Sequence, residues 1–326
     1  MTSALTSRTD GAPVGLKGGP DRPLTVPEPM APAPSLAVRA RPVMADLIAL
    51  TKPRIMELVV VTGAATAVVA AGGWPGARPL TAVILGGGMA AGGAGSINCA
   101  LEGELDRRMP RTRHRAVAAG RIPAGVALAQ GILLNVAAMI LIVAATNRLT
   151  AALTLCGTLW YVFVYTLWLK PRTAHNIVVG GLAGSFPPLA GWAAVTGTVG
   201  VTALALAGVI FLWTPPHFWA LATLADDDYR AAGVPMLPSM VGARRTARAM
   251  LVYAVGTAAA SLVPVAAGDV GLLYLAVALA GGAWLIGACR RHLGALEPAT
   301  ARRVFLGSLG YLGALFAAAA VDVVLL

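Results

Sequence analysis

The strongest constraint in this sequence is a series of nine apolar stretches, each about as long as a membrane-crossing helix. Such a helix needs roughly 20 mainly apolar residues, because the hydrocarbon layer is about 30 Å thick. Of the 326 residues, 57% are hydrophobic and 12% are charged, whereas about 25% are charged in an average soluble domain. The sequence therefore predicts an all-α polytopic membrane protein with nine transmembrane helices, at about 57–74, 80–101, 124–146, 149–169, 176–196, 201–224, 249–267, 270–289 and 304–326.

The distribution of lysine and arginine predicts the orientation, because basic residues in short loops stay on the cytoplasmic side. The loops after the odd-numbered spans contain only Arg78 and Arg148, and the other basic residues lie in the N-terminal segment or the even-numbered loops. We therefore expect a multi-pass protein of the bacterial inner membrane, with its N-terminus in the cytoplasm and its C-terminus outside. The net charge of +11 follows from this topology and requires no nucleic-acid partner.

The chain divides by composition into two parts. Residues 1–43 are rich in Pro, Ala, Thr and Ser and have no long apolar run. Such a segment cannot bury enough apolar surface to fold alone. We expect residues 1–43 to form a disordered cytoplasmic tail and residues 44–326 to form the transmembrane domain.

A polar motif, NCALEGELDRRMPRTRHR, follows the second apolar stretch. Its residues Asn98, Glu102 and Asp106 are four positions apart and lie on one stripe of a helix. Hard oxygen ligands suit Mg²⁺, which often bridges carboxylates to substrate phosphates, and the arginines behind them suit phosphate oxygens. The motif favours a diphosphate site. The alternative is that these acids form ion pairs with the neighbouring arginines in a solvated loop.

A second acidic cluster, Asp226, Asp227 and Asp228, follows the sixth span on the same predicted side of the membrane. Two facing acidic motifs can hold metal ions on one diphosphate and help an allylic C–O bond to ionise. The alternative interpretation is a solvated helix end.

His217, in WTPPHFWALA, lies on the sixth span, eleven residues before Asp228 and about 16 Å away along a regular helix. It is a candidate proton acceptor or haem ligand. The alternative is a buried histidine bonded to a backbone carbonyl that the prolines leave free. We expect Pro215 and Pro216 to break this helix, and the prolines at 187–188 to break the fifth span and widen a cavity.

Taken together, the ordered motifs resemble the haem-farnesylating branch of the UbiA superfamily of intramembrane prenyltransferases, over roughly residues 47–326. The segments that carry the resemblance are LTKPRIMELVVVTG, NCALEGELD, RTRHR, YTLWLKPRTAHNIVVGG and WTPPHFWALATLADDDYRAAGVPMLP. The resemblance implies nine helices around a central cavity that opens to the cytoplasmic side and the lipid. It also implies that the farnesyl group of farnesyl diphosphate is transferred to a vinyl group of haem B with addition of water, giving haem O and diphosphate. Mg²⁺ is the implied cofactor, and a haem A synthase is a candidate partner.

Candidate roles for individual residues follow from the motif positions and the chemistry. The expected metal ligands are Asn98, Glu102, Asp106, Asp227 and Asp228. The expected substrate-binding residues are Asn98, Arg111, Arg115, Lys170 and Arg172. The candidates for catalysis are Asp106, Asp228 and His217.

The sequence departs from the branch's pattern at a few positions. Ala116 stands where proline is usual, and Pro171 stands where a basic residue is common. Asp226 makes the second cluster unusually acidic.

Two other functions remain open. One is a UbiA-type prenyltransferase that acts on a quinone or chlorophyll precursor. The other is a transporter with broken helices. The acidic clusters lie on one membrane face, and no charged residue lies near the middle of a span, which argues against a transporter.

Overall fold

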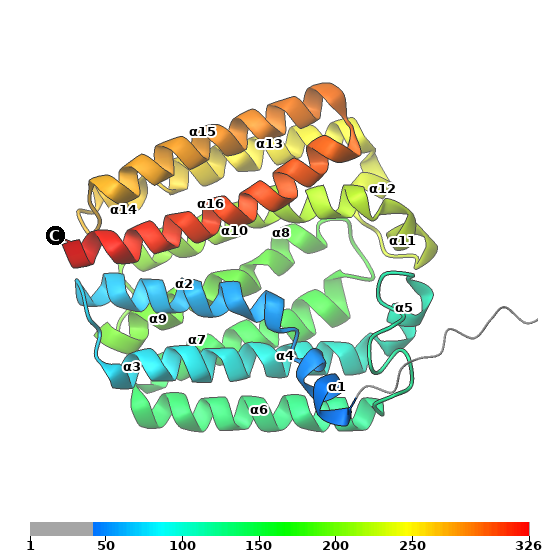
Figure 1. Ribbon diagram of the computed structural model, residues 1–326, viewed down its shortest axis with the longest axis horizontal. Coiled ribbons are helices and arrows are strands. Elements are labelled where there is room, and N and C mark those ends of the chain that lie inside the picture. The colour runs from blue at the N-terminus through cyan, green and yellow to red at the C-terminus, as the bar shows by residue number, and fades with distance from the viewer. Residues whose placement is uncertain (1–41, 326) are drawn as a thin grey trace, which may run out of the picture. The chain divides into compact units, whose positions relative to one another are not determined.

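The computed structural model describes residues 42–325. Residues 1–41 of the expected tail and Leu326 lie outside this range. Within it, nine helices are long and apolar enough to cross a membrane, and they lie side by side in one bundle (Figure 1). The predicted all-α fold class and number of spans are confirmed, and the protein is a multi-pass membrane protein.

Six of the spans consist of one regular helix or of one helix and a short extension. These are α2 (Pro53–Ala71), α6 (Ala124–Ala145), α10 (Val201–Leu224), α13 (Ala243–Ala260) with α14 (Val263–Ala266), α15 (Leu272–Ala295) and α16 (Pro298–Leu325).

The other three spans contain an irregular turn. The second span joins α3 (Ala77–Thr81), the π-helix η1 (Ala82–Gly86) and α4 (Gly87–Leu101). The fourth span joins α7 (Arg148–Leu159) and the π-helix η2 (Trp160–Leu169). The fifth span joins α8 (Asn176–Gly180), the 3₁₀ helix η3 (Gly181–Ser185) and α9 (Phe186–Thr196). The remaining short helices are α1 (Val43–Leu50), α5 (Gly103–Arg108), α11 (Asp226–Ala231) and α12 (Leu237–Val241).

Three helices extend further than their hydropathy predicts. Helix α13 begins at Ala243 rather than at 249, α15 ends at Ala295 rather than at 289, and α16 begins at Pro298 rather than at 304. Each extension carries two or three arginines. A hydropathy window marks only the apolar part of a helix, whereas backbone hydrogen bonds continue the helix beyond the membrane.

Glycine allows close contact between neighbouring helices in the first half of the bundle. A Cβ atom on Gly191 of α9 would meet the backbone oxygen of Gly63 on α2, and one on Gly131 of α6 would lie 2.6 Å from the backbone oxygen of Gly93 on α4. Small residues let transmembrane helices approach until their backbones touch. The glycine-rich second and fifth spans are therefore explained by packing.

The two proline pairs behave differently. The predicted break at Pro215 and Pro216 is wrong, since α10 continues through both residues. Prolines are tolerated in membrane helices where neighbouring helices, side chains or local adjustments satisfy the backbone groups that they leave free.

The predicted break in the fifth span is confirmed. The 3₁₀ helix η3 ends at Ser185, and α9 begins at Phe186 with Pro187 and Pro188 in its first turn. Proline fits this position because the first N–H groups of a helix have no intrahelical partner. Pro187 lines a cavity, and the widening of that cavity by the break stays a prediction.

Both acidic motifs lie at one end of the bundle. Helices α5 and α11 are at the end opposite the C-terminus (right in Figure 1). The largest buried core lies between α10, α13, α15 and α16 and includes Trp219, Tyr274, Leu312 and Phe316. This core supports α10, which is followed directly by α11 and the second acidic motif.

Candidate functional site

The first polar motif lies inside the protein, at the junction of α4 and α5. Asn98, Glu102 and Asp106 are only 2%, 6% and 1% exposed. Helix α4 ends at Leu101, but the N–H groups of Glu102 and Asp106 still donate to the carbonyls four residues earlier (2.9 and 2.7 Å). The four-residue spacing therefore continues across the junction, and the three side chains are buried instead of lying in a solvated loop.

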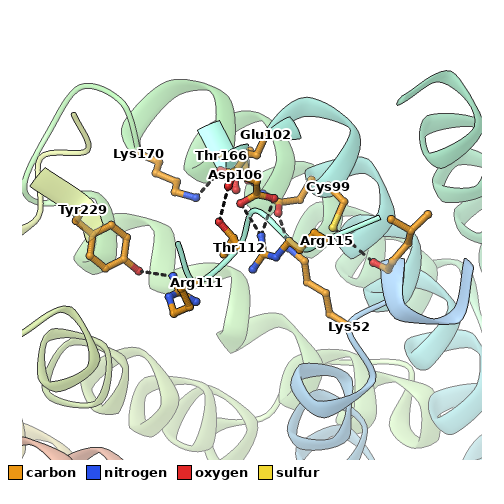
Figure 2. Close-up of polar contacts among 12 residues, drawn as sticks. Lys52, Cys99, Glu102, Asp106, Arg111, Thr112, Arg115, Thr166, Lys170 and Tyr229 are labelled. Atoms are coloured by element: carbon orange, nitrogen blue, oxygen red, sulfur yellow. Dashed lines mark hydrogen bonds and ion pairs between the residues drawn. The ribbon is translucent and has the colours of Figure 1, made fainter. Parts of the chain in front are cut away.

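Both carboxylates form ion pairs, Asp106 with an arginine of the same motif and Glu102 with a lysine from another span (Figure 2). Arg115 Nη1 donates to both carboxylate oxygens of Asp106 at 2.9 Å. Lys170 Nζ, from the end of η2, donates to Glu102 Oε1 at 2.5 Å. The salt-bridge interpretation is thus correct for Asp106, which pairs with a neighbouring arginine, but both carboxylates are buried and Glu102 pairs with a lysine from another span.

Asn98 forms the third such connection. Its side-chain oxygen accepts a hydrogen bond from Lys52 Nζ, at the start of α2. Its Nδ2 donates to Thr166 Oγ1 on η2 (3.0 Å). The amide therefore joins the first, second and fourth spans.

The electrostatic environment differs between two of these basic residues. Burial alone would lower the pKa of Arg115, but the adjacent Asp106 carboxylate outweighs it and raises the pKa. Burial lowers the pKa of Lys52, and the nearby Arg115 adds to that effect, whereas Glu102 and Asp106 oppose it. The charge of Arg115 is therefore balanced by the Asp106 carboxylate, whereas Lys52 donates its hydrogen bond to the neutral Asn98 amide.

Two cavities adjoin this polar cluster. The first has a volume of about 250 Å³. It extends from Lys52, just before α2, to Ile142 near the end of α6 and Thr150 near the start of α7. Its walls are mainly glycine, alanine and other apolar side chains. The second, of about 260 Å³, is lined by Glu102 and Lys170 among others. A polar head and a long apolar tail could therefore occupy adjacent spaces.

The second acidic cluster is more open. Asp226 pairs with Arg230 (2.8 Å) and accepts a hydrogen bond from Ser239. Asp227 is exposed and Asp228 is partly buried. These acids thus resemble the solvated helix end that was the alternative interpretation, although their position beside the first motif still permits binding.

Tyr229 connects the two motifs. Arg111 Nη2 donates to Tyr229 Oη (3.4 Å), and the guanidinium lies 5.9 Å from the centre of the tyrosine ring (Figure 2). Burial raises the pKa of the tyrosine, and Arg111 opposes this. The next loop residues, 232–234, line the same cavity as Glu102. The chain segments that carry the two acidic motifs therefore meet.

The donor atoms of the first motif fit the chemistry of a magnesium site, since Asn98, Glu102 and Asp106 provide buried oxygen atoms. Between residues 42 and 325, however, no group of three or more His, Cys, Asp or Glu side chains is placed to hold a metal ion. The ligand roles of these three residues, and of Asp227 and Asp228, therefore stay predictions.

Arg172 and His217 lie apart from the polar cluster. Arg172 is exposed and donates to the carbonyls of Leu167 and Trp168 (2.8 and 3.0 Å) at the end of η2. It satisfies a helix end, so its role in substrate binding stays a prediction.

His217 is packed between two aromatic rings. Its ring stacks on Trp213 and Phe305, with centroids 4.3 and 4.7 Å away, and its Nδ1 lies 2.9 Å from Ser308 Oγ. These contacts support a packing role between α10 and α16. The residue lines neither of the two cavities, and its role in catalysis stays a prediction.

Sequence reasoning did not assign Lys52, Thr166 or Tyr229 to the site. For Lys52, the available signal was the Lys-Pro pair at the start of the first span. It places a basic side chain at the membrane boundary, where the polar motif also lies. Thr166 lies in an apolar run and Tyr229 follows three aspartates. Neither has a local feature that reveals a partner from another helix.

Most of this chain matches a known protein family. A model described as the UbiA prenyltransferase family matches residues 58–320. The chain belongs to this family. The expected family is therefore confirmed, and the family assignment does not support the transporter alternative.

Several relatives of this UbiA-family protein carry the name protoheme IX farnesyltransferase. One from Thermus thermophilus is 47% identical over 85% of this chain and 46% of its own length. Others are from Gloeobacter violaceus (44% identity, 86% of this chain and 92% of that protein) and Mycobacterium tuberculosis (42%, 88% and 94%). The chain spans about half the length of the Thermus and Roseiflexus relatives it matches.

Solved structures share the fold at low sequence identity. A digeranylgeranylglyceryl phosphate synthase has a TM-score of 0.73 and 16% identity, covering 87% of this chain and 99% of that one. A UbiA homologue from Archaeoglobus fulgidus bound to DMAPP and Mg²⁺ has a TM-score of 0.63 and 14% identity, covering 86% and 99%. These structures support a UbiA-type helical fold.

Proposed function

We propose that this protein is a protohaem IX farnesyltransferase, also called a haem O synthase. The observation that carries the proposal is the buried cluster of Asn98, Glu102 and Asp106, which faces Lys52, Arg115 and Lys170 beside an apolar cavity. The choice of haem as acceptor is supported by the name shared by relatives of similar length at 42–44% identity.

The polar cluster suits the diphosphate of the farnesyl donor. Arginine and lysine bind phosphate oxygens through charge-assisted hydrogen bonds, and Arg111, Arg115 and Lys170 all lie at this end of the bundle. Asn98, Glu102 and Asp106 would hold Mg²⁺, with Asp227 and Asp228 as further ligands. Mg²⁺ bound there would supply positive charge that neutralises the leaving diphosphate.

The apolar cavity suits the farnesyl tail. Its small side chains leave a space that runs along the helices, and its polar end includes Lys52 and Tyr161. The tail would thus lie in the membrane interior with its C1 atom at the polar cluster. Binding of the tail would hold the reacting carbon in one position.

The reaction balances without another reactant. The C1–O bond of farnesyl diphosphate breaks, and diphosphate leaves with the electron pair. A vinyl group of haem B then attacks C1, which forms a carbon–carbon bond and a cation on the haem side. Water adds to that cation and loses a proton, giving haem O. The basic residues stabilise the leaving group, and His217 is retained as a candidate proton acceptor.

The test is the mass of the haem made by membranes that contain this chain. Membranes from a host without its own haem O synthase should accumulate haem O when the chain is expressed, and far less haem O with the Asp106→Asn variant. A prenylated quinone or chlorophyll precursor in place of haem O would assign the alternative acceptor and reject this proposal.

The proposal includes the orientation and partners. The basic ends of the helices support a cytoplasmic N-terminus, an external C-terminus and a location in the bacterial inner membrane. A reporter joined to the C-terminus should be active on the outer side of the inner membrane, and one inserted within residues 107–121 should be active in the cytoplasm. A haem A synthase is a proposed partner because it would use haem O, and it should co-purify with the chain in mild detergent.

A further inference from the structure

Lys52 has an unusual backbone conformation. Its φ and ψ are 53° and 59°, in the left-handed region, and it directly precedes Pro53. Left-handed φ values are uncommon for residues other than glycine, asparagine and aspartate. Such conformations are strained and cluster at functional sites. Glycine would satisfy this backbone at lower cost, so the lysine side chain is the feature to explain.

The contacts of Lys52 differ from those of the other basic residues in the cluster. Arg115 and Lys170 each pair with a carboxylate. For Lys52, the described part of the chain provides a hydrogen bond to the neutral Asn98 side chain and no ion pair. An ammonium group with a neutral partner can gain a stronger interaction when an anion arrives.

Lys52 also occupies a boundary between the two cavities. It lines the apolar cavity, whereas Thr166 lines the cavity beside Glu102 and Lys170. Asn98 lies between them, with hydrogen bonds to both Lys52 and Thr166. A ligand with its tail in one cavity and its diphosphate by the other must therefore pass this chain of hydrogen bonds.

We propose that Lys52 is a positioning residue that exchanges partners when a prenyl diphosphate binds. Without ligand, its ammonium holds the side-chain oxygen of Asn98. With ligand, the ammonium turns to a diphosphate oxygen, which releases Asn98 and connects the two cavities. This inference rests on the proposed function, because it assumes that the cluster binds a diphosphate.

The first experiment separates the ammonium group from the backbone. Lys52→Gly suits the left-handed backbone but removes the side chain. Its affinity for inorganic diphosphate with Mg²⁺ should fall by about tenfold or more, while its affinity for farnesol, which has only the tail, should change little. Arg54→Gly is the matched control, since Arg54 is exposed and two residues away; its diphosphate affinity should remain that of wild type.

The second experiment tests the exchange itself. With EDTA present, Asn98→Leu removes the partner that competes for Lys52, so affinity for metal-free diphosphate should rise by roughly fivefold. That gain should disappear in the Lys52→Gly, Asn98→Leu double variant. A residue that only holds Asn98 in place would show no such gain.

Two results would overturn the proposal. One is wild-type diphosphate affinity in Lys52→Gly, with or without a lower melting temperature. The other is a gain from Asn98→Leu that persists without Lys52. If the wild-type protein also makes haem O, only the exchange is rejected. If wild type binds neither diphosphate nor farnesyl diphosphate and makes no haem O, the proposed function is rejected with it.

Discussion

The two acidic motifs lie at the same end of the bundle but have different surroundings. In the first, Glu102 and Asp106 are buried, and each is paired with a basic residue: Lys170 from the end of the fourth span and Arg115 from the loop that follows α5. In the second, Asp226 is paired with Arg230 one turn away, and Asp227 is exposed. Similar residue types at the same end of the bundle therefore form two different clusters. Glu102 and Asp106 belong to a fixed cluster, which is buried and paired, and Asp226, Asp227 and Asp228 form an open cluster.

This difference suggests separate contributions to binding. Buried, paired groups keep their geometry before a ligand arrives, which lowers the cost of organising the site. Exposed carboxylates remain free to move toward a metal-bound ligand. We therefore expect changes in the first motif to affect both folding and reaction rate, and changes in the second to affect ligand binding alone.

The largest effect is expected from Asp106→Asn. The change removes a proposed metal ligand and leaves Arg115 without its carboxylate partner. Turnover should fall by about 10²–10³-fold, and stability should fall by about 2 kcal/mol, since Arg115 retains some contact with solvent. Haem O formation per folded molecule and thermal unfolding in detergent would measure the two effects.

A double variant provides the control. Asp106→Asn with Arg115→Met removes the unpaired charge, so stability should largely return while turnover stays low. Recovery of turnover together with stability would mean that Asp106 acts only through folding, and the two acidic motifs would then not differ as proposed.

A smaller effect is expected from Asp228→Asn. This residue is partly buried in the first turn of α11 and forms no ion pair in the described structure. The Mg²⁺ concentration needed for half-maximal turnover should rise by about tenfold, with stability within about 0.5 kcal/mol of wild type. Asp226→Asn is the matched control and should shift the Mg²⁺ requirement less. Equal shifts would indicate that only the charge of the cluster matters.

A third prediction concerns His217, on α10, the helix that precedes the open cluster. Loss of its stacking on Trp213 and Phe305 in His217→Gln should lower stability by about 1 kcal/mol. Turnover per folded molecule should stay within about tenfold of wild type. A fall of about 10²–10⁴-fold in a stable variant would instead establish the predicted role as a base. A shift in the haem absorbance with wild-type turnover would indicate iron ligation.

Most of the fold could be predicted because membrane-spanning helices have a strong local signal. Apolar length located all nine spans, and the prolines at 187–188 located the break in the fifth. The same reasoning failed at Pro215 and Pro216, because a proline's effect in a membrane depends on which neighbours satisfy the freed backbone groups. The hydropathy windows also missed the polar helix ends that carry arginines.

The site could be predicted only where its residues are close together in sequence. The spacing of Asn98, Glu102 and Asp106 indicated one stripe, and the structure buries all three side chains. Their pairing with Lys52 and Lys170 could not be deduced, because those contacts depend on how the first, second and fourth spans pack. The local sequence indicates which residues share one side of a helix, but it does not specify which other helix packs against that side.

Asp322 tests whether burial and pairing alone define a functional carboxylate. Like Asp106 it is buried, at 5% exposed, but it accepts hydrogen bonds from the N–H groups of Gly271 (2.5 Å) and Tyr274 (3.0 Å) at the start of α15. Asp322→Ala should cost about 1–2 kcal/mol, as for loss of a helix cap, and Asp322→Asn less. Turnover per folded molecule should not change. A selective loss of turnover would show that the far end of the bundle also contributes to the reaction.

The smallest effect is expected at Glu104, which lies within the first motif but is exposed and pairs with Arg107 one turn away. The hydrogen bond from Arg107 lowers the pKa of Glu104 below its usual value. A carboxylate with a lowered pKa stabilises the folded state above its ordinary pKa, and that contribution is lost as the pH falls through the lowered value. Exposed pairs contribute little, so Glu104→Gln should match wild type in turnover and melting temperature at neutral pH. Both proteins should also respond alike when the pH is lowered toward 4. A clear loss of turnover would mean that the boundary between the fixed and the open carboxylates runs through the first motif itself, because an exposed acid there would then take part in ligand binding.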